Sequence, residues 1–152
     1  MELTTLREAL GPITAVLGSL DLADPARAAA TLTAEFPLDS PIVQRIRELA
    51  EAGQADGTLL PKEAGGVRYG RVGKDCDGFS VDAVWMNGPG PKHRHPRGEI
   101  NLLFRQEGEP TFEGHPEGWA VFAPDSVHVP TVAGGAMLIL YFLPGGAVEW
   151  IR

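Results

Sequence analysis

The sequence predicts a mainly β fold, built as a small barrel or a double sheet, with a short helical segment before it. Three observations predict this fold class. The glycine content changes near residue 58, because four glycines precede that position and the other 15 follow it. Residues 1–58 carry leucines at helical spacing, and residues 59–152 carry short apolar runs between turn residues. We therefore expect a helical segment over residues 1–58 and a β domain over residues 59–152.

Three helices are expected in the first segment. Leucines at helical spacing open the chain, and the pair Gly11-Pro12 is expected to kink or end that first helix. Asp24-Pro25 and Ser40-Pro41 each join an N-cap residue to a proline at the first helical position. Gly53 or Gly57 would end the third helix. We expect these helices to cover an open end of the β domain or to form a subunit contact.

Seven strands are expected in the second segment: Val67–Val72, Phe79–Met86, Glu99–Arg105, Trp119–Phe122, Val127–Val132, Met137–Phe142 and Ala147–Ile151. Turn signals separate them at Asp77-Gly78, Asn87–Gly90, Glu107-Gly108, Gly134-Gly135 and Pro144–Gly146. Short strands at this spacing are typical of a closed barrel or a double-sheet β fold.

Composition excludes several classes of partner. Hydrophobic residues make up 43% of the 152 residues, charged residues 22%, and the net charge is −7. An acidic chain lacks the basic surface that nucleic acids and anionic membranes require. The longest continuous apolar run, Met137–Leu143, suits a buried strand and is too short for a membrane helix. With Cys76 as the single cysteine and no recognisable signal peptide, we expect a soluble cytoplasmic protein.

Three histidines and one glutamate form a pattern typical of a metal site. His93 and His95 are two residues apart, so both side chains point to one face of a strand. Glu99 follows with the same parity, and His128 comes 29 residues later in another expected strand. Three imidazoles and a carboxylate suit Fe(II), Mn, Ni, Cu or Zn, and an octahedral ion would keep positions open for substrate or water. A polar turn at the paired histidines is the alternative, and His115 is expected to be solvent-exposed.

The same residues carry a family resemblance. Gly90–Glu99, followed by Gly108, resembles the first cupin motif, and Gly118–His128 resembles the second. The resemblance implies a jelly-roll β-barrel with the three histidines and the glutamate lining a metal site in its mouth. Ala123 stands where a proline is usual and Asp125 where a turn glycine is usual; no asparagine ends the second motif. Aspartate tolerates the left-handed conformation, so the turn can still form.

A narrower resemblance, to the 4-hydroxylaminobenzoate lyase family, covers segments in both parts of the chain: Phe36–Ser40, Val43–Arg47, Gly65–Arg68, Phe79–Val84, His95–Ile100, Pro116–Trp119, His128–Val132 and Leu140–Ala147. It implies a role in nitroaromatic breakdown, converting 4-hydroxylaminobenzoate to 3,4-dihydroxybenzoate with release of ammonia. That reaction takes one oxygen from water without net redox change, and a divalent metal could polarise the N–O group and present the water. Glu99 and His128 are the candidate catalytic residues, and Glu99 would act as acid or base if metal is bound weakly or not at all.

The implied substrate is a small aromatic molecule with a carboxylate, which calls for a cation and a flat apolar wall. Arg68 and Arg71 lie on opposite faces of one expected strand, so at most one points inward. Trp85 and Tyr141 are candidate walls for the ring. Asn101 shares the parity of the candidate carboxylate ligand and is expected to face the same way.

Two other functions are compatible with these residues. One is a different metal-cupin enzyme, such as an Fe(II) dioxygenase, which would consume oxygen where the lyase needs none. The other is a non-catalytic module that binds a small molecule and releases no product. Cupins are often dimers, so the resemblance also implies a homodimer.

Overall fold

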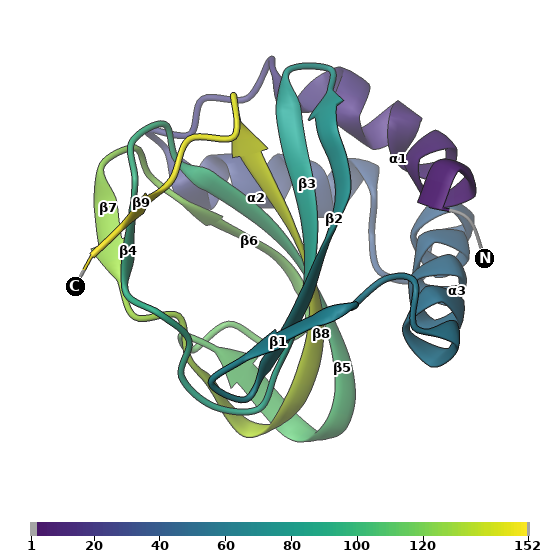
Figure 1. The fold of residues 1–152 in the computed structure, drawn as a ribbon. Coiled ribbons are helices and arrows are strands. Elements are labelled where there is room, and N and C mark those ends of the chain that lie inside the picture. The colour runs from purple at the N-terminus through teal and green to yellow at the C-terminus, as the bar shows by residue number, and fades with distance from the viewer. Residues whose placement is uncertain (1–2, 152) are drawn as a thin grey trace.

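The computed structural model describes residues 3–151, and residues 1, 2 and 152 of the two expected segments lie outside that range (Figure 1). Three helices come first: α1 (Leu3–Leu17), α2 (Pro25–Glu35) and α3 (Pro41–Asp56). The strands that follow are β1 (Lys62–Ala64), β2 (Val67–Cys76), β3 (Phe79–Met86), β4 (His93–His95), β5 (Glu99–Phe112), β6 (Gly118–Phe122), β7 (Ser126–His128), β8 (Val132–Pro144) and β9 (Glu149–Trp150). Within residues 3–151, no helix has the length and apolar character needed to cross a membrane.

The strands form two antiparallel sheets, which confirms a mainly β fold of the cupin jelly-roll type. The large sheet has the order β1-β2-β3-β8-β5-β6, and the small sheet has the order β7-β4-β9. Figure 1 shows the small sheet facing the large one across the interior. The double-sheet form of the prediction is therefore the one observed, since the two sheets are not joined into one hydrogen-bonded barrel.

The helix ends follow the expected capping chemistry at Asp24 and Gly57 but not at Ser40, whose hydroxyl donates to the carbonyl oxygen of Pro37 and makes no capping hydrogen bond. The Asp24 side chain accepts a hydrogen bond from the backbone N–H of Arg27, and Gly57 ends α3 in the left-handed conformation with φ 84°. The predicted end at Gly11-Pro12 is wrong, because α1 contains Pro12 and runs on to Leu17. Fully buried leucine and isoleucine side chains on both sides of the proline hold the turn in place.

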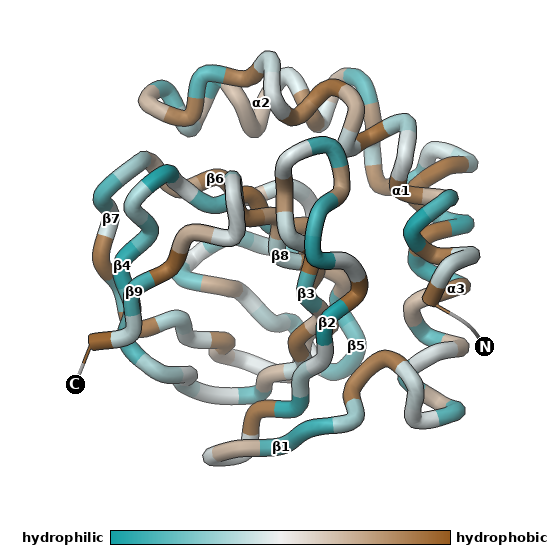
Figure 2. The backbone as a smooth tube through the Cα atoms, turned by 45° about the horizontal axis from the view of Figure 1, so that its top comes forward, coloured by the Kyte–Doolittle hydropathy of each residue, from teal (hydrophilic) through white to brown (hydrophobic). Residues whose placement is uncertain are grey.

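The helices cover a face of the large sheet, which corrects the expectation that they close an open end. Leu32 of α2 and Ile46 of α3 are fully buried in one core cluster with Leu102 of β5 and Leu140 of β8. Figures 1 and 2 both place α1 and α3 beside the large sheet, on the side away from the small sheet. A sheet face lined with large apolar side chains must be covered, and the amphipathic helices provide the cover.

The opposite face of the large sheet lines the interior. Alternate residues of β8, among them Met137, Ile139 and Tyr141, pack in a second apolar cluster with Met86 and Phe112. Both faces of β8 are therefore buried, which explains why its sequence is continuously apolar rather than alternating.

Two predicted turns lie inside strands. Glu107-Gly108 and Gly134-Gly135 are irregular positions where β5 and β8 pass each other, and Gly108 pairs with Gly135. A Cβ atom on Gly135 would lie 1.8 Å from the carbonyl oxygen of Glu107, so only glycine fits there. Glycine serves a bulge as readily as a turn, and both strands extend well beyond the predicted limits as a result.

The strand predicted at Val127–Val132 is also interrupted. β7 ends at His128 and β8 begins at Val132. Pro130 lies between them and has no backbone N–H to continue a hydrogen-bond ladder. The last predicted strand is likewise shorter, since only Glu149–Trp150 pairs with β4.

Candidate metal centre and cavity

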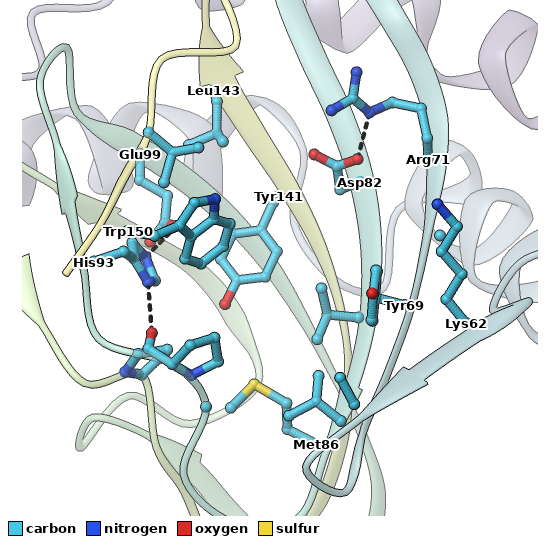
Figure 3. A pocket seen from close by; sticks show the side chains of 18 of the residues that line it. Lys62, Tyr69, Arg71, Asp82, Met86, His93, Glu99, Tyr141, Leu143 and Trp150 are labelled. Atoms are coloured by element: carbon cyan, nitrogen blue, oxygen red, sulfur yellow. Dashed lines mark hydrogen bonds and ion pairs between the residues drawn. The ribbon is translucent and has the colours of Figure 1, made fainter. Parts of the chain in front are cut away.

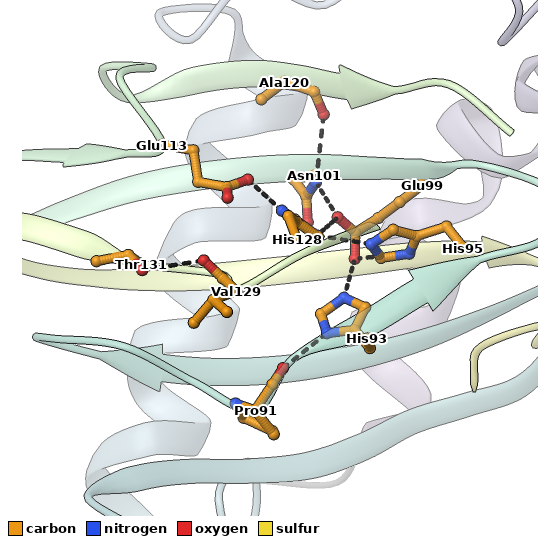
Figure 4. A network of polar contacts seen from close by, with 10 residues as sticks. All are labelled: Pro91, His93, His95, Glu99, Asn101, Glu113, Ala120, His128, Val129 and Thr131. Atoms are coloured by element: carbon orange, nitrogen blue, oxygen red, sulfur yellow. Dashed lines mark hydrogen bonds and ion pairs between the residues drawn. The ribbon is translucent and has the colours of Figure 1, made fainter. Parts of the chain in front are cut away.

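The structure brings the four predicted ligand residues together from both sheets. His93 and His95 lie on β4, and His128 lies opposite His93 on β7 in the small sheet. Glu99 is the first residue of β5 in the large sheet. His93 and His95 face one interior space, as the two-residue period of β4 requires. Glu99 follows a turn that contains Gly98 with φ 91°, and it faces the same space from the large sheet. Figure 4 shows the four side chains converging there.

The cluster is compact and almost entirely buried. The candidate ligand atoms of the four residues lie within 4.8 Å of one another. Glu99 Oε1 is 3.7 Å from His93 Nε2 and 3.5 Å from His95 Nδ1, and Glu99 Oε2 is 3.7 Å from His128 Nε2. The exposed fraction is 1% for the Glu99 side chain and 0% for that of His95.

Hydrogen bonds from outside the cluster orient three of its members. His93 Nδ1 donates to the carbonyl oxygen of Pro91 at 3.0 Å, which turns Nε2 toward Glu99. His128 Nδ1 donates to the carboxylate of Glu113. The Asn101 side-chain amide donates to Glu99 Oε2 at 3.0 Å. Such outer contacts fix the ring orientation and tautomer of metal-binding side chains.

Burial and neighbouring charges set the protonation of the cluster. Burial raises the pKa of the Glu99 carboxyl, against the hydrogen bonds from His93 and Asn101. Burial, together with the nearby imidazoles of His93 and His128, lowers the pKa of His95 to about 3, so this ring is neutral at pH 7. Burial acts to lower the pKa of His93, but the contacts with Glu99 and the Pro91 carbonyl outweigh it and raise that pKa.

The donor set fits a divalent transition metal. His95 Nδ1 is buried and has no hydrogen-bond partner among the described residues. His95 Nε2 and His128 Nε2 lie only 2.6 Å apart, a separation at which two imidazole lone pairs repel unless a proton or a cation lies between them. Buried lone pairs without a donor are costly, and a cation that takes one nitrogen from each ring together with the carboxylate would reduce this cost. Imidazole and carboxylate ligands suit Fe, Mn, Zn, Ni or Cu.

A cavity of about 770 Å³ adjoins this cluster. His93 and Glu99 form part of its wall, and so do Lys62 and Arg71. Figure 3 shows His93 and Glu99 on one side of the cavity and the two cationic side chains on the other. Between them the wall is mainly apolar, with side chains from the inner face of the large sheet, and the volume suits a small-molecule ligand.

The two candidate arginines have different positions, as their parity predicts. Arg71 lines the cavity, and its Nε donates to Asp82 Oδ1 at 2.6 Å. Burial raises the pKa of the Asp82 carboxyl, against the Arg71 contact. Arg68 points to the other face of β2, where its guanidinium lies 5.9 Å from the centre of the Trp85 ring and 3.9 Å from Glu63.

The candidate ring walls also differ. Tyr141 lines the cavity, and burial and the charges of Glu99 and Glu113 raise its pKa well above 10, so the phenol keeps its proton. Trp85 occupies the outer face of β3 with Arg68 and is not part of the cavity wall. Asn101 is fully buried and bonds Glu99, so it supports the cluster from behind.

Sequence reasoning missed two residues. Glu113 lies in a stretch interpreted as a turn, and its backbone is left-handed with φ 48°. Trp150 lies in the last expected strand, yet it lines the cavity beside His93. Neither had a spacing signal, because both reach the site through long-range strand pairing. By contrast, Asp125 has φ 65°, which confirms that aspartate accommodates the turn expected there, and His115 is exposed as predicted.

Comparisons with known proteins show which family the chain resembles. The family model described as "PnbB: 4-hydroxylaminobenzoate lyase" matches residues 14–150. A 4-hydroxylaminobenzoate lyase of Nocardioides sp. (strain LMS-CY) is 34% identical over 125 residues, 73% of each chain. One of Pseudomonas putida is 29% identical over 140 residues, 78% of this chain and 80% of its own. A solved RmlC-like cupin protein from Ralstonia eutropha JMP134 is 12% identical with a TM-score of 0.42; the match covers 59% of this chain and 62% of that chain.

Proposed function

The chain belongs to the 4-hydroxylaminobenzoate lyase family, and on that premise we propose that it converts 4-hydroxylaminobenzoate and water to 3,4-dihydroxybenzoate and ammonia. The observation that carries the proposal is a single cavity with a buried His₃Glu cluster on one side and cationic side chains on the other. A benzoate ring with a hydroxylamine opposite its carboxylate has the same two polar ends. The apolar wall between them suits the ring.

The cluster residues His93, His95, Glu99 and His128 would hold a divalent metal. Such an ion would act as a Lewis acid and weaken the N–O bond of the hydroxylamine. The chain itself keeps the surroundings dry, since Glu99 and His95 are buried. Around these buried side chains, charges on the substrate and on the protein interact more strongly than in bulk solvent.

Arg71 would bind the substrate carboxylate. Asp82 accepts a hydrogen bond from its Nε and so orients the guanidinium, while the terminal nitrogens stay available for a bidentate contact. This contact would direct the opposite substituent of the ring toward the cluster. Tyr141 keeps its proton at neutral pH and would donate a hydrogen bond to the hydroxylamine oxygen as the N–O bond breaks.

The direct test is an anaerobic incubation of the purified protein with 4-hydroxylaminobenzoate, following ammonia and 3,4-dihydroxybenzoate by chromatography. We expect both products in equal amounts. His93→Ala should lose metal and activity together, while the matched control His115→Ala, at the exposed histidine, should lose neither. Unchanged substrate with metal-loaded protein would contradict the proposed reaction.

Three outcomes would favour the alternatives. Oxygen consumption with an aromatic substrate would indicate a dioxygenase of the same fold. Saturable binding without product would indicate a binding module. Activity that survives in metal-free His93→Ala and His128→Ala would remove the metal from the reaction and leave Glu99 as the acid or base.

We also propose that the protein forms a homodimer and is located in the cytoplasm. The homodimer rests on the cupin resemblance, and light scattering on the purified protein tests it directly. A monomer at micromolar concentration would contradict it.

A further inference from the structure

An exposed tryptophan forms part of the cavity wall. Trp150 on β9 is 65% exposed, although the same side chain lines the cavity with Tyr141 and His93. Tryptophan is a large apolar side chain and is highly buried on average in folded proteins. Burying the exposed indole face would therefore be favourable, and a ligand in the cavity can bury it.

The position of the indole relates it to the metal cluster. Trp150 lies opposite His93 in the strand pairing, and the two rings meet edge to face with centroids 5.3 Å apart. A ligand that places a polar group at the cluster can therefore place the next part of its structure beside Trp150. A flat ring is the shape that such a wall binds best, through stacked or edge-to-face contacts.

The backbone on both sides of Trp150 is held in place, while most of the indole is exposed. Arg94 donates to both carboxylate oxygens of Glu149, at 2.8 and 3.2 Å, and also pairs with Asp125. On the other side of Trp150, the backbone N–H of Ile151 donates to the carbonyl of Lys92 at 3.0 Å. Contacts on both flanks reduce the entropy that would be lost when the indole meets a ligand.

The other two tryptophan side chains make their contacts outside the cavity. Trp119 is buried and its indole N–H donates to the carbonyl of Phe36 at 2.9 Å. Trp85 lies on the outer face of β3 beside Arg68. Among the three tryptophans, Trp150 is the one that lines the cavity, so its fluorescence reports on that cavity alone.

We propose that Trp150 binds the aromatic ring of the substrate at the cavity mouth and so selects flat aromatic acids over non-planar ones. The inference rests on the proposed function for the identity of the substrate. It concerns binding, however, and can be tested without turnover. The probe is 4-aminobenzoate, which has the ring and the carboxylate but no N–O bond to break.

The experiment compares the metal-loaded parent protein with Trp150→Ala, Trp150→Phe and the control Trp85→Phe, using calorimetry for affinity and tryptophan fluorescence for contact. We expect 4-aminobenzoate to quench the fluorescence of the parent and of Trp85→Phe. Trp150→Ala should bind it about fivefold more weakly, and Trp150→Phe should recover most of that loss. Metal content and the thermal unfolding midpoint should match the parent in every variant.

A second readout separates ring recognition from a general structural effect. The parent should bind benzoate more tightly than cyclohexanecarboxylate, and Trp150→Ala should lose most of this preference. Equal affinities of parent and Trp150→Ala for 4-aminobenzoate would overturn the proposal, as would failure of the parent to bind it. Binding by the parent without any turnover of 4-hydroxylaminobenzoate would refute the proposed reaction and leave the role of Trp150 standing.

Discussion

The carboxylate behind His128 should contribute measurably to metal affinity. Glu113 accepts the hydrogen bond of His128 Nδ1, and the exposed fractions of the two side chains are only 22% and 12%. Outer carboxylates of this kind change metal affinity by about 10–100-fold when they are removed. Because Glu113 keeps some contact with solvent, we expect the lower end of this range, about tenfold or ~1.4 kcal/mol, for Glu113→Ala.

A graded series sharpens this prediction. Glu113→Gln keeps an oxygen that can accept the hydrogen bond but loses the charge. A neutral hydrogen bond is about half as strong as a charge-assisted one, so the expected loss is about threefold. Glu109→Gln is the matched control, because it removes the same charge from a surface pair with Arg105 in which Glu109 is 87% exposed.

The assay is competition for Zn²⁺ or Co²⁺ against a chelator of known affinity, at constant pH and ionic strength. The expected order of dissociation constants is parent and Glu109→Gln lowest, then Glu113→Gln, then Glu113→Ala. If Glu113→Ala bound metal as tightly as the parent, the contact with His128 would not support the site. If Glu109→Gln weakened binding equally, the effect would be one of overall charge and not of this hydrogen bond.

Four further predictions follow from contacts described above. Arg71→Ala should raise KM for the substrate about tenfold, because it removes a charged contact worth ~1.5 kcal/mol in a half-exposed position. Arg68→Ala should leave KM unchanged. Equal effects of the two substitutions in steady-state kinetics would contradict the assignment of Arg71. The pKa of His93 is raised because its polar contacts outweigh burial, so a metal ion must displace a proton from this imidazole. The apparent metal affinity should therefore increase as the pH rises above 6.5. An affinity that did not change with pH in chelator competition would contradict this prediction. Trp119→Phe removes a buried hydrogen bond and should lower the free energy of unfolding in urea by about 1 kcal/mol. Gly135→Ala sets a Cβ against a backbone carbonyl and should cost about 3 kcal/mol in the same assay, and a cost near zero would show that the strands can separate there.

Three of the four ligand residues of the candidate site lie within seven residues of one another, so their pattern could be recognised in the sequence, and His128 was added from a distant strand. The common direction of His93 and His95 follows from the two-residue period of a strand. Glu99 has the same parity, but it lies beyond a turn on β5 of the other sheet, so its approach to the histidines depends on how the two sheets face each other. The same rule showed that only one of Arg68 and Arg71 could point inward. It did not show which one, because that depends on which face of the large sheet the helices cover.

Residues brought in by distant pairing could not be predicted in this way. Glu113 reaches His128 from the far end of β5, and Trp150 reaches His93 through the pairing of β9 with β4. Trp85 was the tryptophan named as a candidate ring wall, and it lies on the face of β3 that points away from the cavity. Gly134-Gly135 had the composition of a turn, and only the partner strand makes it a bulge.

The cluster draws its donors from both sheets: three histidines come from the small sheet and one glutamate from the large sheet. An ion held by all four would act as a cross-link between two sheets that are not paired with each other by any strand within residues 3–151. Folding and metal loading would then be thermodynamically linked, and each tenfold rise in free metal above the dissociation constant would stabilise the protein by ~1.4 kcal/mol. The small sheet, which has only three short strands, would gain most from this link. The concentration of free metal in the cell would thus affect the stability of the folded protein as well as its activity.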